Sequence, residues 1–176
     1  MAGRRDFGDV VDRITSVAAI VTAAAAVGIG VYQAHITREQ QKKSAWPYLF
    51  QANAYDFHRY ERIVENRGLG PALVRSFRVE VGDSVYDDWP SVVHAVLGHD
   101  PQVIVRSSFH DGMVLLPGHQ TAVLTLPDSA DARAFEARDT ALHTTVCYCS
   151  LYDDCWVFGS RDRRPRPVDD CSGGGD

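Results

Sequence analysis

The residues best suited to chemistry gather near the end of the chain, in the stretch CYCSLYDDC at 147–155. It holds three of the four cysteines, Cys147, Cys149 and Cys155, while Cys171 stands in the terminal segment. Alternate side chains of a strand share a face, so Cys147 and Cys149 would point the same way. If a short loop returns the chain, Cys155 faces Cys149, and a cross-strand disulfide becomes geometrically feasible.

Two other interpretations of these thiols are open. Free cysteines commonly line the buried face of a strand as small apolar side chains, and this is the interpretation we favour. A zinc site would add His143, but structural zinc prefers C-x(2–4)-C pairs, and the C-x-C and C-x5-C spacings here depart from that pattern. We therefore predict no metal and no cofactor, with Cys149 and Cys155 as the alternative disulfide.

Nothing else in the sequence predicts an enzyme. A reactive thiolate needs an electropositive setting, which Asp153 and Asp154 do not give to Cys149. The sequence contains neither a G-x-S-x-G motif nor a P-loop. The His-Asp pairs at 99–100 and 110–111 are expected to be ordinary loop residues.

An apolar segment near the N-terminus is the first element that must position these residues. No charged residue occurs from Ile14 to Thr37, a run of 24, and a membrane-spanning helix needs about 20 apolar residues. We predict a short tail at 1–13, a transmembrane helix at 14–34 and a juxtamembrane helix at 35–46. A cleaved signal peptide and a buried soluble helix are the alternatives. Small residues spaced four apart allow this helix to self-associate.

The charges around the span bear on its orientation. Three basic residues precede it and three follow it, so the positive-inside count is tied. They are Arg4, Arg5 and Arg13 before the span, and Arg38, Lys42 and Lys43 after it. Four cysteines without evident pairing suit a reducing compartment, so we predict a single pass in the cell inner membrane with the globular domain in the cytoplasm. The net charge of −5 and the lack of a long basic run argue against nucleic-acid binding.

Residues 47–160 have the pattern of short strands separated by turns. Phe77, Val79 and Val81 alternate with charged residues, as in a half-buried strand. About seven such segments, one of them at 102–109, predict a mainly β fold, an Ig-like antiparallel β-sandwich. Helix signals at 87–98 and 128–139 add one or two short inserted helices. Residues 161–176 are expected to form a disordered tail.

The stretch NRGLGPA at 66–72 predicts a structural turn made by Asn66, Gly68, Gly70 and Pro71. The glycines can take positive φ angles, and Pro71 cannot donate to a strand ladder. The succession of WPYL, ENRGLGPALV and LLPGHQTAVL after an N-terminal span resembles small bacterial single-pass membrane-anchored proteins with an N-x-G-x-G-P-A β-sandwich domain. The resemblance implies an anchor and a sandwich, and no activity comes with it.

These observations predict a non-enzymatic interaction module that presents a β-sandwich to an unknown protein partner at the inner membrane face. Trp46, Tyr86, Trp89 and Tyr152 are candidate recognition residues, although burial in the core is the interpretation we favour for each of them. The alternative is a periplasmic envelope or structural protein with a Cys149–Cys155 disulfide.

Overall fold

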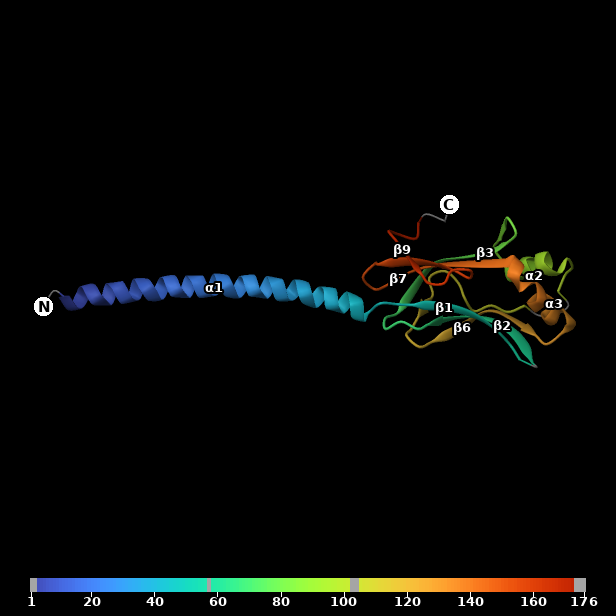
Figure 1. Cartoon of the computed structure of the whole chain (residues 1–176), viewed down its shortest axis with the longest axis horizontal. Coiled ribbons are helices and arrows are strands. Elements are labelled where there is room, and N and C mark those ends of the chain that lie inside the picture. Colours follow the sequence, from blue (N-terminus) through green and yellow to red (C-terminus); the bar gives the residue numbers. More distant parts are fainter. Residues whose placement is uncertain (1–2, 57, 102–104, 173–176) are drawn as a thin grey trace. The chain divides into compact units, whose positions relative to one another are not determined.

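The computed structural model describes residues 3–56, 58–101 and 105–172, and the chain forms two compact units, Met1–Lys43 and Ser44–Asp176 (Figure 1). The first unit belongs to one helix, α1 (Gly3–Ser44). Between Val11 and Ser44 this helix contains an 18-residue window with a mean hydropathy of 2.1, and it is long and apolar enough to span a membrane. One unbroken helix therefore covers the predicted span, the juxtamembrane segment as far as Ser44 and most of the predicted N-terminal tail.

Three hydroxyl groups in the first half of α1 are satisfied within the helix itself. Thr15, Ser16 and Thr22 each donate a hydrogen bond of 2.8 Å to the carbonyl four residues earlier. Because hydrocarbon offers polar groups no partners, this back-bonding makes the hydroxyls compatible with a bilayer.

The second unit contains two antiparallel sheets. The smaller has the strand order β1-β2-β6, made of β1 (Leu49–Tyr55), β2 (Arg59–Asn66) and β6 (Gln120–Pro127). The larger has the order β4-β3-β7-β8-β9, with β5 also pairing with β3. Its strands are β3 (Ala72–Val81), β4 (Ser84–Tyr86), β5 (Val114–Leu115), β7 (Leu142–Cys149), β8 (Cys155–Gly159) and β9 (Arg166–Val168).

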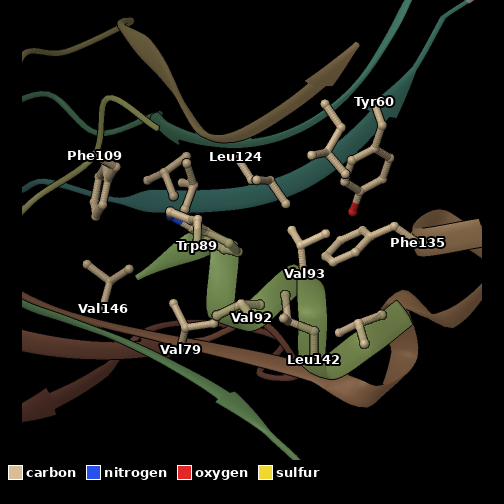
Figure 2. Packing of buried hydrophobic residues seen from close by; sticks show 14 of the residues in the cluster. Tyr60, Val79, Trp89, Val92, Val93, Phe109, Leu124, Phe135, Leu142 and Val146 are labelled. Carbon is tan, nitrogen blue, oxygen red and sulfur yellow. The ribbon is translucent and has the colours of Figure 1, made fainter. Parts of the chain in front are cut away.

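The two sheets share one hydrophobic core. Along β2 the even-numbered residues Tyr60, Arg62, Val64 and Asn66 are buried, as expected for a strand with one face turned inward. Figure 2 shows Tyr60 and Leu124 of the smaller sheet on one side of this core and Val79 and Val146 of the larger sheet on the other. The strands thus supply two facing layers.

Helix α2 (Trp89–Leu97) lies between these layers (Figure 2). The Asp88 side chain caps its first turn by accepting from the Ser91 N–H at 2.8 Å, and Gly98 ends it with a φ of 81°. Val92 and Val93 are fully buried. This agrees with the helix signal read from residues 87–98.

Two segments differ from the sequence-based expectation. Of the strand predicted at 102–109, residues 102–104 lie outside the described residues, and Arg106 makes an isolated bridge with Thr125. The segment expected as a disordered tail contains β9, which pairs antiparallel with β8. Hydrogen bonds to an existing strand edge order this segment, and such long-range pairing leaves little local signal.

Candidate functional site: an aromatic groove and a paired cysteine cluster

A groove of about 610 Å³ opens between β3, β4, the start of α2 and the loop at 107–111. Its volume lies within the range of about 300–1,000 Å³ typical of small-ligand and side-chain pockets. Phe77, Tyr86, Trp89 and Phe109 line it. Tyr86 and Trp89 are two of the four aromatic residues that the sequence nominates for recognition.

The aromatic rings of the groove are held by one another. Phe77 meets Phe109 edge-on with ring centroids 5.0 Å apart, and Trp89 lies 6.2 Å from Phe77. Trp89 and Phe109 are buried, while Tyr86 is partly exposed. Phe77 is partly exposed as well, so the groove has a fixed apolar floor and two accessible aromatic side chains, Phe77 and Tyr86.

Two of the carboxylates that line the groove have structural tasks. The backbone N–H of Ser91 holds the pKa of Asp88 below its usual value, because the capping bond favours the charged form. Asp111 accepts from the Phe77 N–H at 2.7 Å. The remaining polar residues of the lining are Arg78, Asp87, Ser107, Ser108 and His110. An apolar floor with charges of both signs around it suits a partner's side chain.

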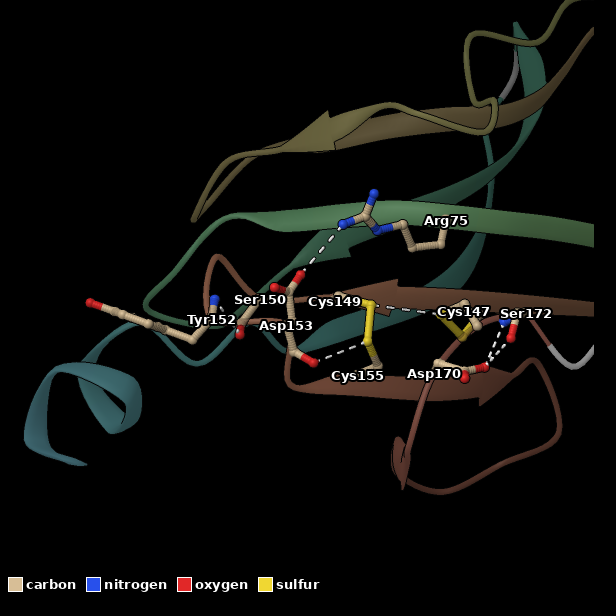
Figure 3. Close-up of a disulfide and its surroundings, with 10 residues drawn as sticks. Arg75, Cys147, Cys149, Ser150, Tyr152, Asp153, Cys155, Asp170 and Ser172 are labelled. Carbon is tan, nitrogen blue, oxygen red and sulfur yellow. Dashed lines mark hydrogen bonds and ion pairs between the residues drawn. A yellow bond between two sulfur atoms is a disulfide. The ribbon is translucent and has the colours of Figure 1, made fainter. Parts of the chain in front are cut away.

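The cysteines form a second cluster, beside Leu73 and Ser76 in the first half of β3. Cys149 and Cys155 stand opposite each other in the β7–β8 register and form one disulfide. Cys171 returns to Cys147, 24 residues away, and forms the other (Figure 3). The two bridges touch, since the Sγ atoms of Cys149 and Cys171 are 3.8 Å apart.

The structure thus pairs the cysteines in place of the free buried thiols that the sequence favours. The Cys149–Cys155 alternative corresponds to one bridge, but the second bridge has no counterpart in the sequence-based interpretation. It forms because β9 brings the terminal segment back beside β8. His143, the predicted fourth metal ligand, instead lies with its Nδ1 3.2 Å from the Ser160 Oγ.

Removing the two bridges should have unequal effects on stability. By chain entropy alone, a bridge closing 24 residues stabilises by about 3.5 kcal/mol, and one closing 6 residues by about 2 kcal/mol. We expect the Cys147→Ala/Cys171→Ala double variant to lose more unfolding free energy than Cys149→Ala/Cys155→Ala. Urea unfolding followed by tryptophan fluorescence measures both losses. Equal losses would show that β9 stays docked without its covalent link.

The predicted turn at 66–71 is a fully bonded corner. The Asn66 side-chain amide donates to the carbonyls of Gly70 and Leu115 at 2.8 and 2.9 Å. Its oxygen accepts from the N–H groups of Gly68 and Tyr48 at 2.9 and 3.2 Å. One buried side chain thereby joins three segments that are distant in sequence.

The corner requires glycine at positions 68 and 70 because neither position has room for a side chain. A Cβ on Gly70 would collide with the backbone of Ala45, and one on Gly68 would collide with the backbone of Trp46 and Tyr48. Positive φ angles, the reason suggested by the sequence, occur among the described glycines at 82, 98, 112 and 118 instead. The corner therefore holds the entering chain tightly against the domain.

A buried polar group that the sequence reading missed lies on β2. Arg62 is 5% exposed and pairs with Asp139 of the 3-10 turn η1 (Asp139–Ala141), and Asn53 also donates to this carboxylate. The turn follows helix α3 (Ala130–Arg138) directly. The two-residue period of a strand could have placed Arg62 on the same inward face as Tyr60 and Val64. The sequence near Arg62 gives no sign that Asp139 is its partner.

Burial raises the pKa of both Tyr60 and Tyr148 well above the usual value for tyrosine, and the charge of Asp139 adds to the effect on Tyr60. Above about pH 10 the unfolded chain loses these protons while the folded chain keeps them. Stability from these groups is therefore complete below pH 10 and should fall by about 1.4 kcal/mol per pH unit for each tyrosine above it.

We expect Tyr60→Phe to remove roughly half of this alkaline slope. At neutral pH it should change the unfolding free energy by less than about 1 kcal/mol, because the Tyr60 hydroxyl has no hydrogen-bond partner among the described residues. Tyr148→Phe is the matched comparison, since its hydroxyl accepts from the Leu49 N–H at 3.3 Å and its loss leaves that donor unpaired. Urea titrations at a series of pH values measure both variants. An unchanged slope in Tyr60→Phe would contradict this assignment.

Comparisons with known proteins found no matching domain family, no matching curated protein and no matching solved structure. The resemblance to small bacterial membrane-anchored proteins therefore stays a prediction.

Proposed function

We propose that this chain is a single-pass membrane-anchored, non-enzymatic interaction module, whose domain is an Ig-like β-sandwich that binds a protein partner. The groove beside Tyr86 carries the proposal. It combines a rigid aromatic floor with charged residues of both signs, which is the make-up of a surface that accepts a partner's side chain. The length and apolar composition of α1 support the anchor.

The side of the membrane on which the domain lies bears on the class of partner. The numbers of basic residues before and after the span are equal, so they favour neither orientation. Disulfides persist in oxidising compartments and are rare in the cytoplasm, so the two bridges support the orientation with the domain outside the cytoplasm. We therefore propose that the module faces the periplasm or cell exterior, with the cytoplasmic face as the alternative.

The anchor and the binding surface are tested on the full chain in its native cells. The protein should remain in the membrane fraction after carbonate extraction. A photo-crosslinking amino acid at Tyr86 should give a discrete product, and the same residue at Tyr55, an exposed tyrosine on the other sheet, should give none. Asp87→Lys should lower the yield from position 86, because it reverses a charge in the groove lining. Equal yields at the two positions would argue against the groove.

A further inference from the structure

The exposed large apolar side chains of the domain are concentrated at one end. Eight such residues belong to the described part of the unit Ser44–Asp176. Six of them, Trp46, Leu69, Val114, Leu116, Leu151 and Tyr152, lie where the chain enters the domain, and Tyr55 and Val85 lie at the other end. Leu69 is 71% exposed and Leu151 is 61% exposed. Isolated exposed leucines are ordinary, but a cluster of them marks a contact surface.

Backbone pairing places the segments that carry these six residues side by side. The Leu69 N–H donates to the Trp46 carbonyl at 2.8 Å, so the corner lies on the entering chain. Leu73 pairs with both Val114 of β5 and Cys149 of β7, and the β7–β8 turn follows directly. Figure 3 shows Tyr152 at the tip of that turn, directed away from the strands. We call this surface the chain-entry end.

The turn at 116–118 joins the same end through the corner. The Gly118 N–H donates to the Asn66 carbonyl at 2.8 Å, which sets Leu116 beside the corner. The opposite end is formed by the β3–β4 turn, where Val85 pairs with Glu80, and by the β1–β2 turn, where Tyr55 pairs with Tyr60. Strand β3 is 10 residues long, about 33 Å at the usual rise of a strand, so the two ends are well separated.

The covalent connection to α1 indicates what covers the chain-entry end. Ser44 is the last residue of α1, and Trp46 follows within two positions. Trp46 is nine residues beyond Thr37, the end of the uncharged run, which is about 14 Å along a helix. The polar layer of a bilayer adds about 5–8 Å on each side of the hydrocarbon. For a helix along the bilayer normal, Trp46 therefore lies about 6–9 Å beyond the outer edge of the headgroups, and tilting of α1 brings it closer.

The charges at this end suit a lipid surface of no net charge. Lys42 and Lys43 lie in the last turn of α1, where long basic side chains can reach headgroups. Within the domain, Arg67 pairs with Glu65 at 2.7 Å and Arg75 lies 3.6 Å from Asp153. These pairs leave the apolar side chains as the main attraction, and tryptophan and tyrosine favour the interface.

We propose that the chain-entry end rests on the lipid headgroups of the membrane that holds α1, with the tips carrying Leu69, Leu116 and Leu151 inserted among them. This inference rests on the anchor proposed above. It deepens that proposal, because a domain seated on lipid has a fixed orientation and turns the groove, which lies along the second half of β3 and along β4, toward partners away from the bilayer.

The test uses the full chain in phosphatidylcholine nanodiscs, with a fluorescent amino acid at one of three positions. A nitroxide on the lipid headgroup should quench the reporter at Leu151 at least about twofold, as expected for a side chain among headgroups. A reporter at Val85, which is 55% exposed and of similar apolar character, should be unaffected. A reporter at Val27 in α1 should be quenched by a nitroxide on the acyl chain.

The three positions separate the possible failures. If Val27 is not quenched, the anchor itself is wrong. If Val27 is quenched and Leu151 is not, the anchor stands and the seating on lipid is overturned. A blue-shifted Leu151 reporter without quenching would show that protein, such as a second copy of this chain, covers the end instead.

A second variant removes the influence of the reporter's own apolarity. With the reporter at Leu116, the changes Leu69→Glu and Leu151→Glu should reduce the headgroup quenching by at least about half, because charged tips cost free energy at the interface. Unchanged quenching would overturn the role of these tips. Near-ultraviolet circular dichroism verifies that each variant keeps its core.

Discussion

The chain taken from its native membrane and denatured without reductant will bind no maleimide, and after reduction it will bind four. The structure pairs all four cysteines, and none of the described cysteines is free. Such pairing persists in oxidising surroundings and is rare in the cytoplasm. A polyethylene-glycol maleimide, which adds a countable mass for each thiol, measures the result on a gel.

The same reagents determine the orientation of the domain. In intact cells, a membrane-impermeant reductant followed by an impermeant maleimide should label the chain if the domain lies outside the cytoplasm. The Cys147→Ala/Cys171→Ala variant is the control, because it should show two additions in place of four. Four free thiols before any reductant would contradict this prediction and restore the cytoplasmic orientation. Zinc bound to the purified protein would then point to the thiolate site considered from the sequence.

Sequence periodicity was sufficient for the elements whose signals are local. The uncharged run from Ile14 to Thr37 falls within α1, and capping residues at both ends of the segment 87–98 mark α2. The predicted boundaries of the membrane helix were less accurate, because the polar residues that flank the apolar run continue α1 in both directions. The alternation of apolar and charged residues identified β3 for the same local reason.

Long-range pairing could not be predicted from the sequence. Cys171 stands beside the glycine-rich end of the chain, which reads as a flexible tail, and only the pairing of β9 with β8 explains its bridge to Cys147. The ion pair between Arg62 and Asp139 joins residues 77 apart in the chain. Such contacts depend on sheet order, and several orders are compatible with the same pattern of strands.

The groove is another feature that could be predicted only in part from the sequence. The sequence nominated Tyr86 and Trp89 as recognition residues on chemical grounds, and the structure places both in one groove. It separates them from Trp46 and Tyr152, which are exposed at the chain-entry end. The sequence therefore suggested the residue types, while the division into two surfaces follows from the direction of β3.

Replacing Asn66 with alanine should destabilise the domain by about 3–5 kcal/mol. The change removes four hydrogen bonds at a side chain that is 0% exposed. It leaves the carbonyls of Gly70 and Leu115 buried without this donor, and each unsatisfied buried group costs about 1–3 kcal/mol. Urea unfolding of the full chain in detergent, followed by near-ultraviolet circular dichroism, measures the loss, since α1 contributes little to that signal.

A comparison of two substitutions separates the bonding of Asn66 from the general cost of losing an amide. Asn53→Ala removes an exposed amide that donates to Asp139, so we expect it to cost no more than about 1 kcal/mol. Asn66→Asp keeps the oxygen that accepts from Gly68 and Tyr48 but removes the donor to the two carbonyls. It also buries a charge, so it should be at least as harmful as Asn66→Ala.

If Asn66→Ala cost as little as Asn53→Ala, the corner would not hold the entering chain in place. The chain-entry end would then lack the rigid base that its seating on the membrane requires.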